Sequence, residues 1–180
     1  MNEETIKSKL VYEGRILNLR VDTVSGPNGI SEREIIDHAQ AVTILPFEAP
    51  NTIYLIHQFR KPTEQILIES PAGCIEDSED VESAALRELT EETGFIAKKM
   101  TKVGEMYMAP GFCNEYMHFF IAQGLTSGAT NFDSDEYIEL KKYSLIDVKQ
   151  MIKDGKIIDA KTILGVYFIE EFIREGTHIL

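Results

Sequence analysis

The order of the elements expected along the chain predicts an α+β fold with a mixed β-sheet. Short apolar or alternating segments, which favour strands, occupy most of the first 70 residues. One amphipathic helix follows, then more strands, and then two further helices. Because strands and helices do not alternate one for one, this order argues against a doubly wound parallel sheet.

The N-terminal strands are separated by residues that favour turns. Glu13-Gly14 interrupts the first two strands as in a hairpin, and Gly, Pro and Asn mark turns at residues 25–29 and 48–51. The strands expected in this part of the chain cover residues 10–12, 15–24, 33–37, 41–47, 52–60 and 66–69.

The first helix is expected over residues 80–93, and Gly94 follows where helices often end in a left-handed residue. Its apolar stripe, at helical spacing, consists of Val81, Ala84, Ala85 and Leu89. After this helix the sequence predicts strands over residues 102–108, 116–122 and 137–143, a loop over residues 124–135, and helices over residues 145–153 and 160–174.

The composition excludes several classes of protein. With 30 acidic and 18 basic residues the net charge is −12, which argues against a nucleic acid or an anionic membrane as partner. The acidic N-terminus lacks the apolar stretch of a signal peptide, and no apolar run approaches the roughly 18 residues of a membrane helix. Cys74 and Cys113 lack the spacing of a disulfide framework or a zinc site. We therefore expect a cytoplasmic protein.

Three glutamates on one face of the first helix are the strongest candidates for chemistry. Glu88 and Glu92 are four residues apart, and Glu91 follows Glu88 by three. Like charges at such spacings cost about 0.2–0.5 kcal/mol per pair. A divalent cation such as Mg²⁺, which prefers oxygen ligands, would offset this repulsion. The alternative is a solvated acidic face stabilised by ion pairs, for example with Arg87.

A longer pattern around this helix favours the metal site. Its fixed positions are Gly73, Glu79, Arg87, Glu88, Glu91, Glu92 and Gly94, accompanied by apolar Leu89 and Phe95. This spacing matches the Nudix box, G-x5-E-x7-R-E-U-x-E-E-x-G-U, in which U is apolar. The chain therefore resembles the Nudix hydrolases.

The resemblance implies a Nudix α/β/α sandwich and hydrolysis of a nucleoside diphosphate linked to another group. It implies Mg²⁺ as the cofactor, with Mn²⁺ as the alternative. Arg87 is assigned to the catalytic group because, paired with Glu79, it would orient the ligand carboxylates. The metal ligands implied are the carbonyl of Ala72, Glu88 and Glu92, with Glu91 as a further ligand or as a partner of the metal's water shell.

Three further segments resemble the ADP-ribose pyrophosphatase branch, over about residues 8–175. Pro110-Gly111, sixteen residues after Gly94, stands in A-P-G-F-C-N-E, where the branch has S-P-G-x-x-x-E. The strand before the box ends in E-S-P-A-G, like the branch's E-U-P-A-G, with Ser70 at a usually apolar place. The strand before that ends in H-Q-F-R, like Q-Y/F-R. The substrate-binding residues implied are Arg33, Arg60, Glu69, Pro110, Gly111 and Glu115.

On this resemblance we expect Mg²⁺-dependent hydrolysis of ADP-ribose to AMP and ribose 5-phosphate. The alternatives are a pyrophosphatase for another nucleotide sugar, such as GDP-mannose or a UDP-sugar, and a Nudix domain that binds ADP-ribose without hydrolysing it. The branch also implies a homodimer. Residues 1–40 are expected to form an N-terminal antiparallel β extension that makes the dimer, and residues 41–180 the Nudix domain.

The catalytic base is open among three acidic residues. In this branch it often lies in a loop after the Pro-Gly motif, which here covers residues 131–138. Glu136 aligns best, both as the base and as an additional metal ligand, although Ser134 stands where some relatives have a second Glu. Glu91 and Asp133 are the other candidates for the base.

Overall fold

The computed structural model describes residues 2–128 and 137–176, and the chain divides into two compact units. The first unit comprises Met1–Ala41 and Glu105–Met117. The second unit comprises Val42–Gly104 and His118–Leu180.

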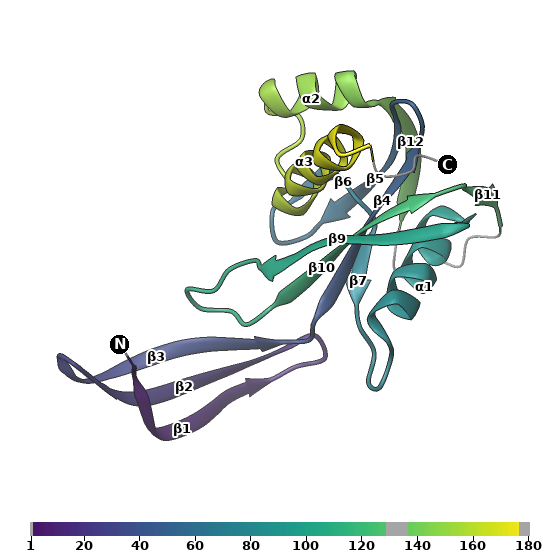
Figure 1. The fold of residues 1–180 in the computed structure, drawn as a ribbon. Coiled ribbons are helices and arrows are strands. Elements are labelled where there is room, and N and C mark those ends of the chain that lie inside the picture. Colours follow the sequence, from purple (N-terminus) through teal and green to yellow (C-terminus); the bar gives the residue numbers. More distant parts are fainter. Residues whose placement is uncertain (1, 129–136, 177–180) are drawn as a thin grey trace. The chain divides into compact units, whose positions relative to one another are not determined.

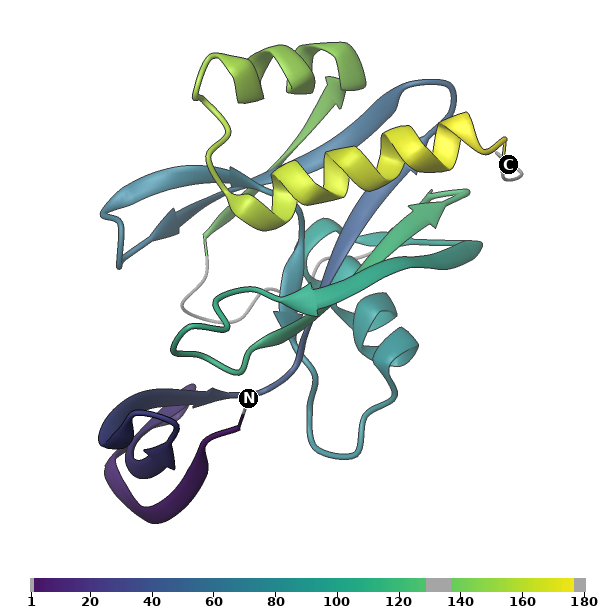
Figure 2. The same cartoon turned by 60° about the vertical axis from the view of Figure 1, so that its left-hand side comes forward.

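The first unit is built on an antiparallel sheet in the order β1-β2-β3. Strand β1 (Glu4–Glu13) pairs with β2 (Leu17–Gly26), which pairs in turn with β3 (Gly29–His38). Gly26 lies opposite Gly29, so a two-residue turn joins β2 to β3, and Gly29 adopts the φ of 102° that this turn requires. Figure 2 views the sheet nearly end-on and shows its strong twist.

The second unit carries the larger sheet, in the order β12-β5-β4-β10-β9, with β6 beside β5 and β7 beside β4. Strands β8 (Phe95–Ile96) and β11 (Thr126–Ser127) pair separately. The strands of the larger sheet are β4 (Ala41–Glu48), β5 (Thr52–Arg60), β6 (Gln65–Glu69), β7 (Ala72–Cys74), β9 (Lys99–Tyr107), β10 (Tyr116–Gln123) and β12 (Ile138–Ser144).

Strand β4 explains why helices cover both faces of this sheet, since all of its residues from 41 to 47 are buried. Its side chains alternate between two apolar clusters. Leu45 and Phe47 pack with α2 (Leu145–Lys153) and α3 (Ala160–Arg174). Val42 and Ile44 pack with α1 (Val81–Thr93) on the other face. Figures 1 and 2 show these layers, with α3 lying lengthwise over the sheet.

The expected α+β fold with an α/β/α sandwich is therefore confirmed, and four strands differ from the expectation. Strand β1 begins at Glu4 rather than at Leu10. All of its residues are exposed. A strand with no buried face needs no alternation of apolar and polar residues, so the sequence does not mark where this strand starts. Strands β7, β8 and β11 are two or three residues long and were not expected.

Within residues 2–128 and 137–176, no helix has the length and apolar character needed to cross a bilayer.

Candidate active site

Helix α1 is capped at both ends, and the C-terminal cap, Gly94, is the one that the sequence singles out. Asp80 caps its N-terminus, where its carboxylate accepts from the backbone N–H groups of Glu82 and Ser83 at 3.1 and 3.2 Å. Gly94 ends the helix with a φ of 69° and donates its N–H to the carbonyl of Thr90 at 2.8 Å. These caps fix where α1 begins and ends, and its apolar residues Ala84, Ala85 and Leu89 pack against the sheet.

The glutamates of α1 meet the backbone of β7. The N–H of Ala72 donates to Oε2 of Glu92 at 3.0 Å, and Glu92 is only 4% exposed. The carboxylate of Glu88 lies against Gly73, so closely that a Cβ at this position would collide with it. The structure thus brings together Ala72, Glu88 and Glu92, which the sequence predicts as metal ligands.

Arg87 connects the remaining carboxylates of the box. Its guanidinium donates two hydrogen bonds of 2.9 Å to Glu79, in a bidentate pair. It also donates to Glu88 at 2.7 Å, to Glu91 at 3.0 Å and to the carbonyl of Cys74 at 3.0 Å. The hydrogen bond to Glu79 is the main reason why the pKa of Arg87 is raised, and the same bond lowers the pKa of Glu79. The expected ion pair between Arg87 and Glu79 is present.

The donor set around Gly73 suits a hard divalent cation. Carboxylates and a backbone carbonyl are oxygen ligands, and the absent Cβ of Gly73 leaves room beside the carboxylate of Glu88. Arg87 contacts Glu88 and Glu91, and the N–H of Ala72 contacts Glu92. In the described part of the chain, no three His, Cys, Asp or Glu side chains are gathered as a ready metal cluster.

Arg60 and Glu69, two predicted substrate-binding residues, form an ion pair in which the carboxylate is buried and the guanidinium is partly exposed. Arg60 donates two hydrogen bonds of 2.9 Å to the carboxylate of Glu69, which is 1% exposed. Lys161, at the start of α3, also contacts Glu69 and lies 3.1 Å from Asp159. Burial would raise the pKa of Glu69, but the hydrogen bond from Arg60 and the charge of Lys161 outweigh it, and the pKa is lowered.

Lys161 and Asp159 were missed by sequence reasoning. Lys161 is 92 residues from Glu69 along the chain, and only the packing of α3 brings the two together. The sole local signal is Asp159, a residue type that favours helix N-caps, followed two positions later by a lysine. This signal predicts a helix start and gives no indication of a buried ion pair.

In the first unit, Arg33 lies in a cleft with Pro110 and Gly111, as the resemblance implies for a shared substrate site. Arg33 pairs there with Glu3, with a hydrogen bond of 3.0 Å from Nε. Glu115 is not among the lining residues. The cleft has a volume of about 440 Å³ and is lined by Glu3, Arg33, Glu34, Ile35, Tyr107, Pro110, Gly111, Phe112, Cys113 and Asn114.

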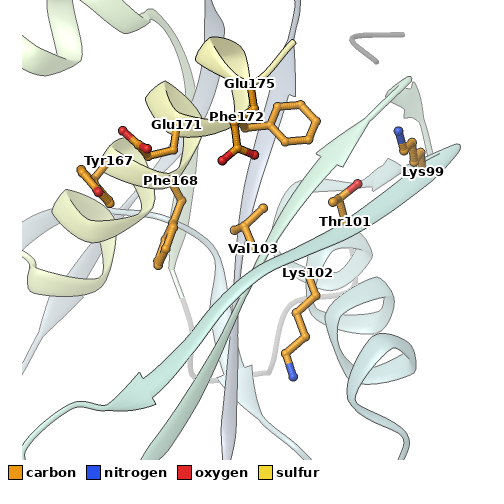
Figure 3. Close-up of a pocket in the computed structure, with 9 residues that line it drawn as sticks. All are labelled: Lys99, Thr101, Lys102, Val103, Tyr167, Phe168, Glu171, Phe172 and Glu175. Atoms are coloured by element: carbon orange, nitrogen blue, oxygen red, sulfur yellow. The ribbon is translucent and has the colours of Figure 1, made fainter. Parts of the chain in front are cut away.

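A second cleft, of about 490 Å³, lies between β9 and α3 in the second unit. Phe168, Phe172 and Val103 form its apolar wall, whereas the side chain of Lys102 points away from α3 (Figure 3). None of the predicted site residues lines this cleft.

The loop assigned to the catalytic base lies for the most part outside the described residues. This applies to Asp133, Ser134 and Glu136, and so to Glu136 both as the base and as a metal ligand. Glu91, the remaining candidate, is partly exposed and bonded to Arg87.

Comparisons with known proteins agree with this arrangement. A model of the NUDIX domain matches residues 37–164, and a model of the nucleoside diphosphate sugar hydrolase N-terminal domain matches residues 3–36. The chain is 38% identical to an ADP-ribose pyrophosphatase of Bacillus subtilis (strain 168) over 173 residues, which is 94% of either chain. It is 39% identical to a methanol dehydrogenase activator of Bacillus methanolicus over 171 residues, covering 93% of this chain and 92% of that one.

Two further similarities are more distant. A GDP-mannose pyrophosphatase of Yersinia enterocolitica is 37% identical over 148 residues, 77% of either chain. A crystal structure of an ADP compounds hydrolase shares the fold, with a TM-score of 0.86 at 23% identity over 98% of this chain and 97% of the other. With the NUDIX model spanning well over half of its residues, the chain belongs to the Nudix family.

Proposed function

We propose that the protein hydrolyses the pyrophosphate of ADP-ribose to AMP and ribose 5-phosphate with Mg²⁺ as cofactor. The observation that carries this proposal is the complete Nudix carboxylate set, of which Glu88 and Glu92 lie directly against the backbone of Ala72 and Gly73. The choice of ADP-ribose is supported by the relative from Bacillus subtilis, which matches nearly the whole chain.

The residues of the second unit would have two roles in the reaction, holding the cation and orienting the carboxylates that bind it. Glu88, Glu91, Glu92 and the carbonyl of Ala72 would hold the cation. A bound divalent cation neutralises the pyrophosphate and lowers the pKa of a water bound to it. Arg87 keeps its partner carboxylates oriented, because one rigid guanidinium bonds to several of them at once.

The polar groups that bind substrate are proposed in both units. In the second unit, Arg60 and Glu69 form a rigid, charged pair of the kind that orients a polar ligand. In the first unit, the cleft containing Arg33, Pro110 and Gly111 offers one cation and exposed aromatic rings. A nucleotide sugar presents the matching groups, which are phosphates and a base. Glu115 and Glu136 remain proposals from the family resemblance.

A homodimer is proposed from the exposed edge of the first unit. Strand β1 ends the three-stranded sheet and is exposed along its whole length. Ile6, Leu10 and Tyr12 on this strand are 57%, 54% and 58% exposed, respectively. An exposed strand edge with apolar side chains favours pairing with another chain. We assign residues 1–40 to this dimer-forming extension and residues 41–180 to the Nudix domain.

A reducing cytoplasm is the proposed location of the reaction. Neither Cys74 nor Cys113 forms a disulfide, and Cys74 is exposed. Exposed cysteines without a disulfide are typical of proteins that function in a reducing compartment.

GDP-mannose is the second candidate substrate, because a GDP-mannose pyrophosphatase is 37% identical to the chain. A panel of ADP-ribose, GDP-mannose and UDP-glucose, with Mg²⁺ and with the products identified, separates the two. We expect kcat/KM for ADP-ribose to exceed the others by at least about tenfold, a difference of about 1.4 kcal/mol in transition-state binding. A preference for GDP-mannose would overturn the proposed substrate, and binding of ADP-ribose without turnover would indicate a sensor.

A further inference from the structure

Three buried hydroxyl groups follow one another beside the segment that leads into the metal carboxylates. Thr43 on β4, Ser70 between β6 and β7, and Thr162 on α3 are each 0% exposed. The hydroxyl oxygens of Thr43 and Ser70 are 2.7 Å apart, and those of Ser70 and Thr162 are 3.3 Å apart. Ser70 is the position where the sequence departs from the usual apolar residue of the branch.

Each hydroxyl can donate only one hydrogen bond, so the acceptor of each proton can be assigned in turn. Thr162 is 2.6 Å from the carboxylate of Asp159, so its proton goes to that charged acceptor. Its oxygen then accepts the backbone N–H of Ser70 at 2.7 Å. If Thr43 donates to the carbonyl of Pro71 at 3.1 Å, Ser70 donates to Thr43 and every proton has an acceptor.

At the Thr162 end, the series of hydroxyls is held by two charged residues. Asp159 caps α3, accepting the N–H of Thr162 at 3.0 Å, and lies 3.1 Å from Nζ of Lys161. Lys161 also contacts Glu69, the residue before Ser70. The start of α3 therefore contacts two consecutive residues of the segment, Glu69 through Lys161 and Ser70 through Thr162.

The same segment is held at every residue up to the metal carboxylates. Besides Glu69 and Ser70, the carbonyl of Pro71 accepts the N–H of Ile44 at 2.8 Å in addition to the hydroxyl of Thr43. The N–H of Ala72 then reaches Glu92. An apolar side chain at position 70 could fill the same volume, but it could not fix the backbone through directed hydrogen bonds.

We propose that the hydroxyl chain of Thr43, Ser70 and Thr162 positions the backbone of Ala72 and Gly73 for binding of the divalent cation. The three are positioning residues, because none of them is assigned as a ligand and they act through the backbone of Pro71 and Ala72. This inference rests on the proposed function, since it takes the metal site around Glu88 and Glu92 as its target.

The test is direct binding of Mn²⁺ to the full-length protein without substrate, measured by electron paramagnetic resonance. Thr43→Val and Thr162→Val keep the side-chain shape and remove the hydroxyl. We expect each to raise the Kd for Mn²⁺ at least about tenfold, and Thr43→Ser and Thr162→Ser to restore it to within about threefold of the wild type. The Mg²⁺ concentration for half-maximal activity should rise in parallel, whereas KM for substrate at saturating Mg²⁺ should stay nearly constant.

Thr101→Val is the matched control. The hydroxyl of Thr101 is buried and makes no hydrogen bond within the described residues, and it belongs to the cleft of Figure 3 rather than to the hydroxyl chain. Its loss should leave the Kd for Mn²⁺ unchanged. If Thr162→Val does not fold, Ser70→Ala replaces it, because that change keeps the backbone bond from residue 70 to Thr162.

The outcomes separate this inference from the proposed function. Valine variants that bind Mn²⁺ as tightly as Thr101→Val would overturn the positioning role and leave the metal site intact. Wild-type protein that binds no Mn²⁺ would overturn the metal site itself. A loss of Mn²⁺ binding that the serine variants do not restore would show that packing, and not the hydroxyl groups, is responsible.

Discussion

Arg87 bonds to three carboxylates that would otherwise repel one another. Glu79, Glu88 and Glu91 all accept hydrogen bonds from its guanidinium at 2.7–3.0 Å. Each like-charge pair on the helix costs only about 0.2–0.5 kcal/mol, so one shared cation is enough to offset the repulsion. The acidic face of α1 is therefore compatible with a stable helix before any cation binds.

Glu92→Gln should abolish most turnover and leave the fold intact. Glutamine can still accept the N–H of Ala72, which Glu92 accepts at 3.0 Å, but it lacks the charge that a divalent cation requires. We expect kcat to fall at least about 100-fold, or about 3 kcal/mol in transition-state stabilisation, in steady-state assays at saturating Mg²⁺.

Glu82→Gln is the control for this variant. Glu82 lies on the same helix, in its first turn, and is exposed. Its neutralisation should not change kcat. Near-normal turnover by Glu92→Gln would remove the metal assignment.

Glu136→Gln should lower kcat much more than it changes KM. A base or ligand that acts mainly in the transition state affects kcat and kcat/KM together. Glu91→Gln is the comparison, because Glu91 is the competing candidate on α1. The assignment of the base to Glu136 is wrong if that variant keeps wild-type kcat and Glu91→Gln does not. Steady-state kinetics of both variants decide the question.

At the scale of elements, helix α3 depends on a glycine that permits close packing. A Cβ at Gly165 would collide with the side chain of Leu45, which is fully buried on β4. In an exposed helix, replacing glycine by alanine adds about 1 kcal/mol of stability. Here the collision should reverse the sign of that effect.

Gly165→Ala should lower the free energy of unfolding by about 1–2 kcal/mol, because overpacking a buried site outweighs the gain in helix propensity. Urea denaturation measures the change. Adding Leu45→Val, which removes the colliding methyl groups, should recover part of the loss relative to Leu45→Val alone. An increase in stability on Gly165→Ala would show that Leu45 moves aside at no cost.

The sequence predicts the elements well where local signals exist. Helix α1 spans Val81–Thr93, within one residue of the expected 80–93, and ends at Gly94 as the pattern indicates. The start of β1 was missed because the whole strand is exposed, and β7 because it consists of only Ala72–Cys74 beside a proline. Both strands are defined by pairing with distant or neighbouring strands and not by their own periodicity.

The candidate site was likewise predictable only where its residues lie close together in the sequence. The carboxylates of the box follow from spacing within about 20 residues, and the ion pair of Arg87 with Glu79 follows from the resemblance. The contact of Lys161 with Glu69 joins residues 92 positions apart, and no local pattern carries that information. The same holds for the hydrogen bond that the backbone N–H of Ser70 donates to the hydroxyl of Thr162.

For the whole molecule, the exposed β1 strand leads to a prediction about assembly. Deleting residues 1–24 removes β1 and most of β2, and it should yield a monomer with weaker binding of ADP-ribose. Light scattering after size exclusion and KM measurements test this. Because a deletion can also unfold the first unit, Ile6→Lys with Leu10→Lys is a milder version.

Ile146→Lys is the control for the lysine substitutions, since Ile146 is 75% exposed but lies on α2. It should leave the oligomeric state unchanged. A truncated monomer that binds ADP-ribose normally would contradict the role of the extension.

Stability should depend on pH through Glu69. Its folded-state pKa is lowered below the ordinary 4.5, so its contribution is complete above pH 4.5 and is lost as the pH falls through the folded-state value. Glu69→Gln should cost about 3 kcal/mol at pH 7, because Arg60 and Lys161 lose their buried partner. Urea denaturation of both proteins from pH 7 to pH 3 should show the difference shrinking below pH 4.5. A constant difference would assign the effect to packing.

The discontinuity of the first unit limits how this protein can be taken apart or recombined. Its two stretches, Met1–Ala41 and Glu105–Met117, are joined by backbone bonds of Ile36 with Phe112 and Asn114. Dividing the chain near residue 41 would therefore separate Ile36 from its hydrogen-bond partners Phe112 and Asn114. Neither fragment contains the whole first unit, and exchange of the N-terminal strands between relatives has to include the segment at residues 105–117, which comprises the ends of β9 and β10 and the loop between them.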